Sequence, residues 1–160
     1  MSIKISHITF VVKDLELSAT FFERIFKAKV VYSSLSAKYM TVNNVWIALN
    51  KGDSLSERSY NHIAFQIQDS EFSNYLNIIN EMGLDIKSGR PRSIGEGRSI
   101  YFYDYDNHLF ELHTGTLNER IASYQLLDDV ATPADLVMIA ESQKDYERGE
   151  TVSHDDINWD

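Results

Sequence analysis

The segment DYDNHLFELHTGTLNER, from Asp104 to Arg120, sets a glutamate and two histidines into a short apolar run. If the run is a strand, its side chains alternate between two faces, so Leu109, Glu111 and His113 share one face. A carboxylate on such a strand costs free energy unless a cation or hydrogen bonds compensate its charge. Imidazole and carboxylate groups together are a common ligand set for divalent metals. The segment therefore indicates a metal site.

An internal repeat supplies two further histidines. SHITFVVKDLELS, which begins at Ser6, aligns with NHIAFQIQDSEFS, which begins at Asn61, so His7 and His62 are equivalent. Each copy reads as a strand, an aspartate-capped helix and three short strands. Two such βαβββ units would form a curved mixed sheet around a central cup. We expect a pseudo-twofold axis to bring His7, His62 and Glu111 together on the floor of this cup as a metal triad.

His108 and His113 are the alternatives to this triad. A single strand histidine is usually an ordinary core or surface residue, so the assignment depends on the joint pattern of the repeat. His108 points away from the face of Glu111 and is typical of a turn, whereas His113 could hydrogen-bond to a ligand. Ala48 stands where the first half would carry the equivalent of Glu111. Three protein ligands would leave coordination positions open for a substrate.

A loop rich in glycine and arginine, SGRPRSIGEGRSIYFYD, precedes the strand that carries Tyr101. Guanidinium forks bind phosphate-like oxygens well, although a solvated basic loop is the more ordinary interpretation of this segment alone. The capped helix start TGTLNER and a threonine beside His7 add further groups that could bind an anion. The candidates are Thr9, Arg90, Arg92, Arg98, Thr116, Glu119 and Arg120.

Composition limits the location and the chemistry. The 160 residues are 43% hydrophobic, enough for one core. The sequence has no apolar run of membrane-spanning length and no signal-peptide pattern, so we expect a cytoplasmic protein without membrane partners. Because cysteine is absent, metal ligands must be His, Asp or Glu.

The distribution of charge divides the chain near Leu127. Before this residue there are 14 acidic and 13 basic side chains, and from it onward there are 10 acidic and 2 basic ones. A nearly neutral body with an acidic tail argues against nucleic acid as a partner. We expect one domain over residues 1–126, with halves of about 1–55 and 56–126, and an acidic extension over 127–160.

The acidic extension contains one predicted helix. Thr132 suits an N-cap, Pro133 suits the first helical position, and Gly149 suits the end. An appended helix that packs on the body or frays is the expectation for this segment.

The motifs SHITFVV, YNHIAFQI and GEGRSIYFYDYDNHLFELHTGTL resemble those of the vicinal oxygen chelate superfamily, and within it those of the fosfomycin resistance proteins. The resemblance covers about Met1 to Tyr124. It is dense from Tyr60 to Leu117, where it points to the FosX type, metal-dependent hydrolases that add water to the epoxide of the antibiotic. It implies an α+β glyoxalase fold, a manganese-favouring site and a homodimer with paired halves from both chains. The implied metal ligands are His7, His62 and Glu111. The implied phosphonate contacts are Thr9, Tyr39, Arg92, Tyr101 and Arg120.

One position departs from the FosX pattern. That type carries a glutamate general base, and counting back from Trp46 places it at Ala37, in a segment without acidic residues. No catalytic base is therefore assigned, although Glu57 or Glu96 could stand in. The stretch KYMTVNNVWIALN is more similar to the thiol transferase types, which add glutathione or bacillithiol. We expect an enzyme that opens the fosfomycin epoxide with water or a small thiol. A metal-free protein that sequesters the drug is the alternative.

Overall fold

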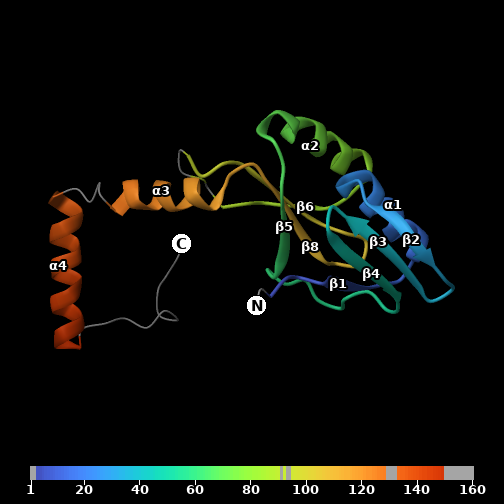
Figure 1. Cartoon of the computed structure of the whole chain (residues 1–160). Helices are drawn as coiled ribbons and strands as arrows, with labels where there is room; N and C mark the ends of the chain where they lie inside the picture. Colours follow the sequence, from blue (N-terminus) through green and yellow to red (C-terminus); the bar gives the residue numbers. More distant parts are fainter. Residues whose placement is uncertain (1–2, 91, 93–94, 129–132, 150–160) are drawn as a thin grey trace.

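The computed structural model describes residues 3–90, 92, 95–128 and 133–149, and its body consists of two similar units (Figure 1). The first unit contains β1 (His7–Val12), α1 (Leu15–Phe26), β2 (Lys29–Ser33), β3 (Ala37–Val42) and β4 (Val45–Lys51). The second contains β5 (His62–Gln66), the 3₁₀ turn η1 (Asp69–Glu71), α2 (Phe72–Glu81), β6 (Ile86–Lys87), β7 (Ser99–Tyr103) and β8 (Leu109–His113). The paired βαβββ repeat predicted from the sequence is confirmed.

Each unit forms one mixed four-stranded sheet. The strand orders are β1-β4-β3-β2 and β5-β8-β7-β6, and in both sheets the first pair is parallel while the others are antiparallel. Thr9 lies opposite Ala48, and Ala64 lies opposite Glu111. The matching registers show that equivalent residues of the repeat occupy equivalent places in the two sheets.

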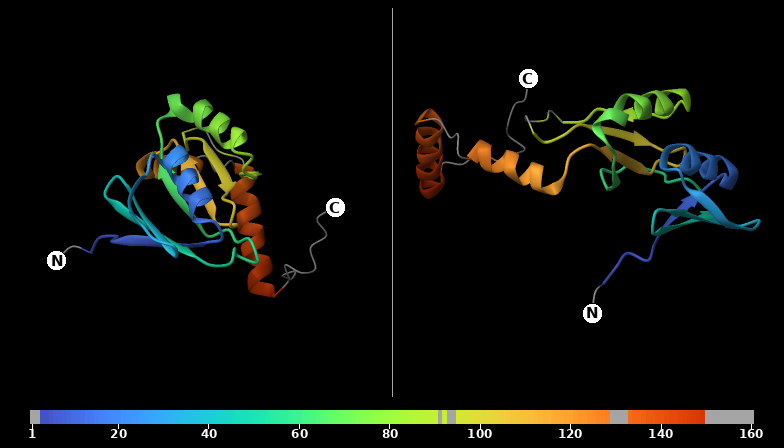
Figure 2. Two further views of the ribbon diagram at one scale, coloured as in Figure 1. Left: turned by 90° about the vertical axis from the view of Figure 1, so that its right-hand side faces the viewer. Right: turned by 45° about the horizontal axis from the view of Figure 1, so that its top comes forward.

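One face of each sheet packs into a common core with the helices. Along β1, Phe10 and Val12 are buried while His7, Thr9 and Val11 are exposed, as period-two alternation requires. Helices α1 and α2 lie next to each other on the same side of the sheets (Figures 1 and 2). The core joins both units through an aromatic cluster. Its rings include Phe10, Phe21, Phe22, Phe26, Phe102 and Phe110. The second face of each sheet is left outside this core.

Local sequence signals explain the helix ends with one correction. The Asp14 carboxylate caps α1 by accepting hydrogen bonds from the backbone N–H groups of Glu16 and Leu17. The equivalent Asp69 is not the N-cap of α2, because it lies inside the 3₁₀ turn that precedes this helix. Gly83 follows α2 with a positive φ of 65°, which fits its predicted role as a stop.

The turn between β7 and β8 ties the two units together. The buried Asp106 carboxylate accepts hydrogen bonds from the backbone N–H of Lys13 at 2.9 Å and from the hydroxyl of Ser54 at 2.5 Å. His108, in the same turn, places Nδ1 2.8 Å from the Asp104 carboxylate. The interpretation of His108 as a turn residue is therefore confirmed.

Two helices follow the sheets. Helix α3 (Leu117–Asp128) and helix α4 (Pro133–Arg148) extend away from the body (Figures 1 and 2). Helix α4 begins at the predicted proline, and Gly149 follows it with a φ of 72°, whereas Thr132 lies outside the described residues. Because α3 runs across the expected boundary at residue 127, the division into a domain and an extension stays a prediction. Among the described residues, no helix is long and apolar enough to cross a membrane.

Candidate metal centre and anion-binding site

His62 and Glu111 form a close pair on the second sheet. His62 Nε2 lies 2.9 Å from Glu111 Oε2, and His62 Nδ1 lies 2.8 Å from the carbonyl oxygen of Tyr60. A carbonyl only accepts, so Nδ1 carries a proton and Nε2 is the nitrogen that faces the carboxylate. When Nε2 carries no proton, its lone pair and the carboxylate oxygen can bind the same cation. The pair therefore fits two ligands of one divalent metal.

Hydrogen bonds keep the Glu111 carboxylate ionised. Burial alone would raise its pKa, because the side chain is only 5% exposed. Hydrogen bonds from Ser99 and Tyr101 and the charges of the nearby histidines outweigh burial and hold the pKa below its usual value. Oε1 lies 2.5 Å from the Ser99 hydroxyl and 3.1 Å from Arg92 Nη2. An ionised, oriented carboxylate is what metal ligation requires.

Two arginines present buried donors without acceptors. Arg92 Nη2 donates to Ser99 and Tyr101, whereas Arg92 Nη1 and Arg120 Nε are buried without a hydrogen-bond partner among the described residues. Burial lowers the pKa of His113, and both guanidinium groups lower it further, so both lie within electrostatic reach of the same ring. Unmatched buried donors are rare and call for an acceptor. The two arginines therefore fit an anion with several oxygens.

The other two arginines of the loop serve structural ion pairs. Arg90 binds the fully buried Glu96 through two bonds of 2.5 and 2.9 Å, and Arg98 binds Asp69 at 2.8 Å. Arg90 and Arg98 therefore pair with carboxylates of the protein, and the phosphonate contacts of Arg92 and Arg120 stay predictions. The same pairing makes Glu96 a poor candidate for a catalytic base.

Three further candidate residues lie on the first sheet. Thr9 and Tyr39 both pair with Ala48, so they share one face with His7, whose ring lies 4.6 Å from that of Trp46. We call His7, Thr9 and Tyr39 the first half-site. The second half-site is His62, Arg92, Tyr101, Glu111 and Arg120.

One chain does not bring the two half-sites together. Among the described residues, which include His7, His62 and Glu111, no three His, Asp or Glu side chains form a group that could hold a metal. These residues of one chain therefore do not form the triad by themselves, and the triad of His7, His62 and Glu111 stays a prediction. The physical reason is the common core: each sheet packs its apolar face into it, which leaves the polar face of each sheet outside rather than opposed to the other.

The structure also locates the position of the missing base. Ala37 shares the open face of the first sheet with Tyr39, and it pairs with Asn50 on β4. Strands β1, β3 and β4 contain no acidic residue, so the face of the first half-site presents no carboxylate. The other candidate, Glu57, is exposed in the segment between the two units.

Sequence reasoning missed Ser99 and the contact of Trp46 with His7. Ser99 lies two residues before Tyr101 on the same face of β7, just as Ala37 lies two residues before Tyr39 on β3. The repeat and the period of two could therefore have revealed Ser99.

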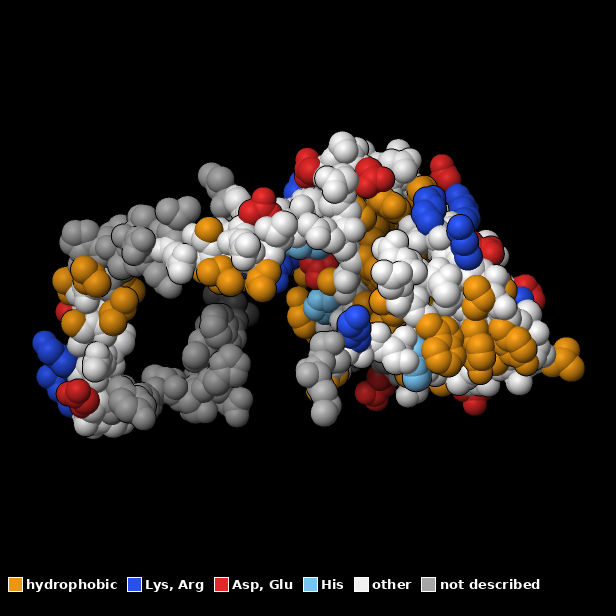
Figure 3. Space-filling model, in the orientation of Figure 1, with side chains coloured by type: hydrophobic (Ala, Val, Ile, Leu, Met, Phe, Trp, Pro, Cys, Tyr) orange, Lys and Arg blue, Asp and Glu red, His pale blue; other side chains and the backbone are white. Residues whose placement is uncertain are grey.

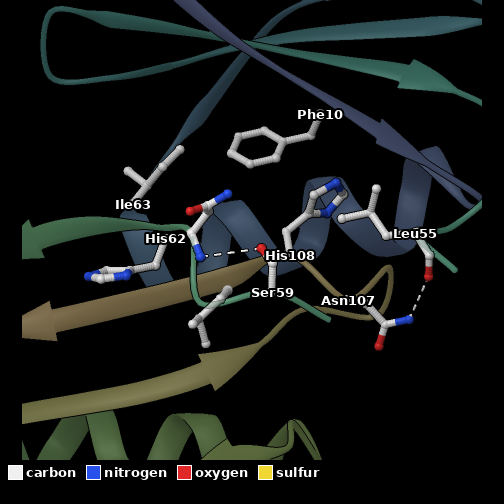
Figure 4. Close-up of a pocket in the computed structure, with 9 residues that line it drawn as sticks. Phe10, Leu55, Ser59, His62, Ile63, Asn107 and His108 are labelled. Carbon is white, nitrogen blue, oxygen red and sulfur yellow. Dashed lines mark hydrogen bonds between the residues drawn. The ribbon is translucent and has the colours of Figure 1, made fainter. Parts of the chain in front are cut away.

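A hollow of about 280 Å³ beside β5 includes His62 in its lining and otherwise extends away from this site. Figure 4 shows Phe10, Leu55 and His108 around it, with the ring of His62 turned away from them. Its lining contains no carboxylate. A smaller hollow of about 210 Å³ is lined by His113, Gly115, Thr116, Leu117 and Arg120, next to the unmatched donor of Arg120.

Known proteins share this fold and sequence. Residues 4–112 match the model of the Glyoxalase/Bleomycin resistance protein/Dioxygenase superfamily. The fosfomycin resistance protein FosX of Listeria innocua is 52% identical over 127 residues, which span 75% of this chain and 96% of that protein. The metallothiol transferase FosB of Staphylococcus saprophyticus is 38% identical over 125 residues, which span 76% of this chain and 83% of that protein.

A solved structure shares this fold. A mutant of FosX from Listeria monocytogenes, crystallised with Mn(II) and 1S,2S-dihydroxypropylphosphonic acid, matches with a TM-score of 0.74 and 53% identity. The match covers 78% of this chain and 99% of that one. Since the family model spans nearly all of both repeats and the relatives match over most of their own length, the chain belongs to the glyoxalase/bleomycin resistance protein/dioxygenase superfamily, among the fosfomycin resistance proteins.

Proposed function

We propose that this chain is a manganese-dependent enzyme that inactivates fosfomycin by opening its epoxide ring. The observation that carries the proposal is the His62–Glu111 pair beside two buried guanidinium donors without acceptors. A mutant of the related FosX was crystallised with Mn(II) and a dihydroxypropylphosphonate, a compound with a phosphonate and the two hydroxyl groups that the addition of water to an epoxide leaves. His7, His62 and Glu111 would hold the metal. The metal would act as a Lewis acid on the epoxide oxygen.

The protein groups of the second half-site bind and orient the phosphonate. Arg92 and Arg120 direct their unmatched donors at its oxygens and neutralise its charge. Burial and hydrogen bonds to Tyr60 and Glu111 raise the pKa of Tyr101, so its phenol stays protonated at neutral pH and remains a donor.

A homodimer would complete the site. In this arrangement the first half-site of one chain faces the second half-site of its partner, and each dimer holds two complete sites. The first sheet supports this proposal because large apolar side chains of its strands and of the turn after β2 are exposed, and Figure 3 shows hydrophobic side chains gathered on the surface of the body. These side chains are Val11, Val30, Val31, Tyr32, Leu35 and Trp46.

Mixing two inactive variants tests the shared site. His7→Ala and His62→Ala each remove one ligand from every site of their own homodimer, so both should be inactive. In a mixed dimer, one site loses both histidines while the other keeps both, so mixing after dissociation should restore activity. A site contained within one chain would show no restoration. Matched mixing of His62→Ala with Glu111→Ala is the control, because both changes affect the same half-site and no intact site can form.

The nucleophile is water or a thiol, and Ala37 is the observation that favours the thiol. Water needs a positioned base to attack an epoxide, and such assistance is worth about 10²- to 10⁴-fold. Strands β1, β3 and β4 offer none. A thiol is partly ionised near neutral pH and is a stronger nucleophile, so it needs less help. The matches to both FosX and FosB are consistent with either product.

Product analysis decides among these outcomes. The purified chain would be incubated with fosfomycin and Mn²⁺, with and without glutathione or bacillithiol, and the products followed by ³¹P NMR and mass spectrometry. A diol identifies hydrolysis and a thioether identifies thiol transfer. Tight binding without turnover would instead indicate drug sequestration and contradict the proposed enzyme. A cytoplasmic location stays a prediction, which fractionation of cells that produce the chain would test.

A further inference from the structure

We propose that Ser99 positions Glu111 for the metal by holding one carboxylate oxygen and leaving the other free to ligate. This inference rests on the metal centre of the proposed function. Ser99 begins β7, and its hydroxyl lies 2.5 Å from Glu111 Oε1, 2.6 Å from Arg92 Nη2 and 2.8 Å from His113 Nδ1. One small side chain therefore joins a metal ligand, an arginine and a histidine.

The directions of these three hydrogen bonds follow from the chemistry of the groups. A serine hydroxyl has one proton and two lone pairs. Arg92 only donates, so it uses one lone pair, and the ionised Glu111 only accepts, so it takes the proton. His113 Nδ1 must then donate to the second lone pair. The carbonyl oxygen of Arg98, 3.1 Å from the same nitrogen, also requires a proton there. Both contacts give the same tautomer, and the hydroxyl is fully used.

This arrangement makes the two oxygens of Glu111 unequal. Oε1 receives the hydroxyl of Ser99 at 2.5 Å and Nη2 of Arg92 at 3.1 Å. Oε2 faces Nε2 of His62 at 2.9 Å. The carboxylate is therefore anchored through one oxygen and presents the other beside the histidine ligand. Removal of a group that holds a metal ligand in this way typically weakens metal binding by about 10- to 100-fold.

Ser99 also keeps Arg92 from competing with the metal. The Ser99 hydroxyl accepts a hydrogen bond from Arg92 Nη2 at 2.6 Å, which is shorter than the 3.1 Å between Nη2 and Glu111 Oε1. Without the hydroxyl, the guanidinium would be free to turn toward both carboxylate oxygens, since bidentate pairing is its preferred geometry. Such a pair would occupy Oε2. The hydroxyl thus separates the group that binds the anion from the group that binds the metal.

The test compares Mn²⁺ affinity in three variants of the full chain, measured by calorimetry and by EPR of free Mn²⁺. Ser99→Ala removes the hydroxyl, and Ser99→Thr keeps it. Ser54→Ala is the matched control, because the Ser54 hydroxyl makes a bond of the same 2.5 Å length to the carboxylate of Asp106, away from the metal centre. We expect the Kd of Mn²⁺ to rise about 10- to 100-fold in Ser99→Ala and to stay within about threefold of wild type in the other two.

Several outcomes overturn the inference. Unchanged affinity in Ser99→Ala, an equal loss in Ser54→Ala, or no recovery in Ser99→Thr would each show that the hydroxyl does not position the ligand. If Ser99→Ala does not fold, Ser99→Cys fills similar space with a weaker donor and should show the same loss of affinity. Failure of the wild-type chain to bind Mn²⁺ would instead overturn the metal centre itself, and with it the role of Ser99.

Discussion

Replacement of Arg92 by alanine should separate substrate binding from metal binding. The Arg92 side chain is 14% exposed, its Nη1 is a buried donor without an acceptor, and its Nη2 approaches Glu111 at 3.1 Å. The residue thus contacts a metal ligand on one side and offers a donor on the other. The proposed function assigns the free donor to the phosphonate, so the substitution should act mainly on the substrate.

The expected magnitude follows from this geometry. Removal of one charged partner from a partly buried ion pair costs about 2 to 4 kcal/mol. If this loss applies to the transition state, kcat/KM should fall about 30- to 1,000-fold. Mn²⁺ affinity should change by less than about threefold. Ser99 still holds Oε1 of Glu111, and although the Arg92 contact with this oxygen is lost, a positive charge beside the cation is removed as well.

The assay measures both quantities in the same preparations. Epoxide opening is followed at saturating Mn²⁺ to obtain kcat/KM, and Mn²⁺ binding is measured without fosfomycin. Arg92→Lys serves as the graded control, since an ammonium keeps the charge but cannot donate as a fork, and it should fall between wild type and alanine. Unchanged kcat/KM in Arg92→Ala would refute the phosphonate assignment. A loss of Mn²⁺ affinity as large as the loss of kcat/KM would show that Arg92 acts through the metal ligand instead.

Three further predictions address the base, the metal and pH. Ala37→Glu places a carboxylate on the face of Tyr39. In the absence of thiol, this variant should form the diol faster than wild type, by up to the 10²- to 10⁴-fold that a well-placed base contributes. If Ala37→Glu is no faster than Ala37→Gln, the lack of a base is not what limits hydration. His62→Ala should lose most of its Mn²⁺ by metal analysis, whereas His108→Ala, in the turn, should keep it, and equal retention in both would remove His62 from the ligand set. Burial lowers the pKa of His113 in the folded chain. Below about pH 6.5, His113 is therefore protonated in the unfolded chain more readily than in the folded chain. The metal-free protein should therefore lose stability as the pH falls from about 7 to about 5, and denaturant unfolding of His113→Gln should show a weaker dependence on pH than wild type if this residue contributes.

The elements of the fold and the identity of the metal-binding candidates were readable from the sequence. Strand alternation, helix caps and glycine stops act over a few residues, so β1, α1 and their repeats could be predicted from local patterns. The repeat made His7 and His62 equivalent, and the period of two placed Glu111 and His113 on one face of their strand. These inferences needed only neighbours along the chain.

The partners of the charged groups were decided only by the tertiary structure. Arg90, Arg92 and Arg98 look alike in the sequence, yet Arg92 reaches Glu111, whereas Arg90 and Arg98 pair with Glu96 and Asp69. Which carboxylate an arginine meets depends on how loops fold over the sheet, and loop paths leave no periodic signal in the sequence. The repeat and the period of two could have placed Ser99 on this face, but its contacts with Glu111, Arg92 and His113 come only from the packing of these groups around it.

The separation of the two half-sites also required the tertiary structure. The repeat predicts that both sheets carry a polar face, but it does not say whether those faces meet within one chain. They do not, because the apolar faces of both sheets and the helices α1 and α2 share a single core, and burial of that apolar surface dominates the packing. Sequence periodicity records which face of a sheet is apolar, whereas the placement of one sheet against another depends on the packing of the whole core.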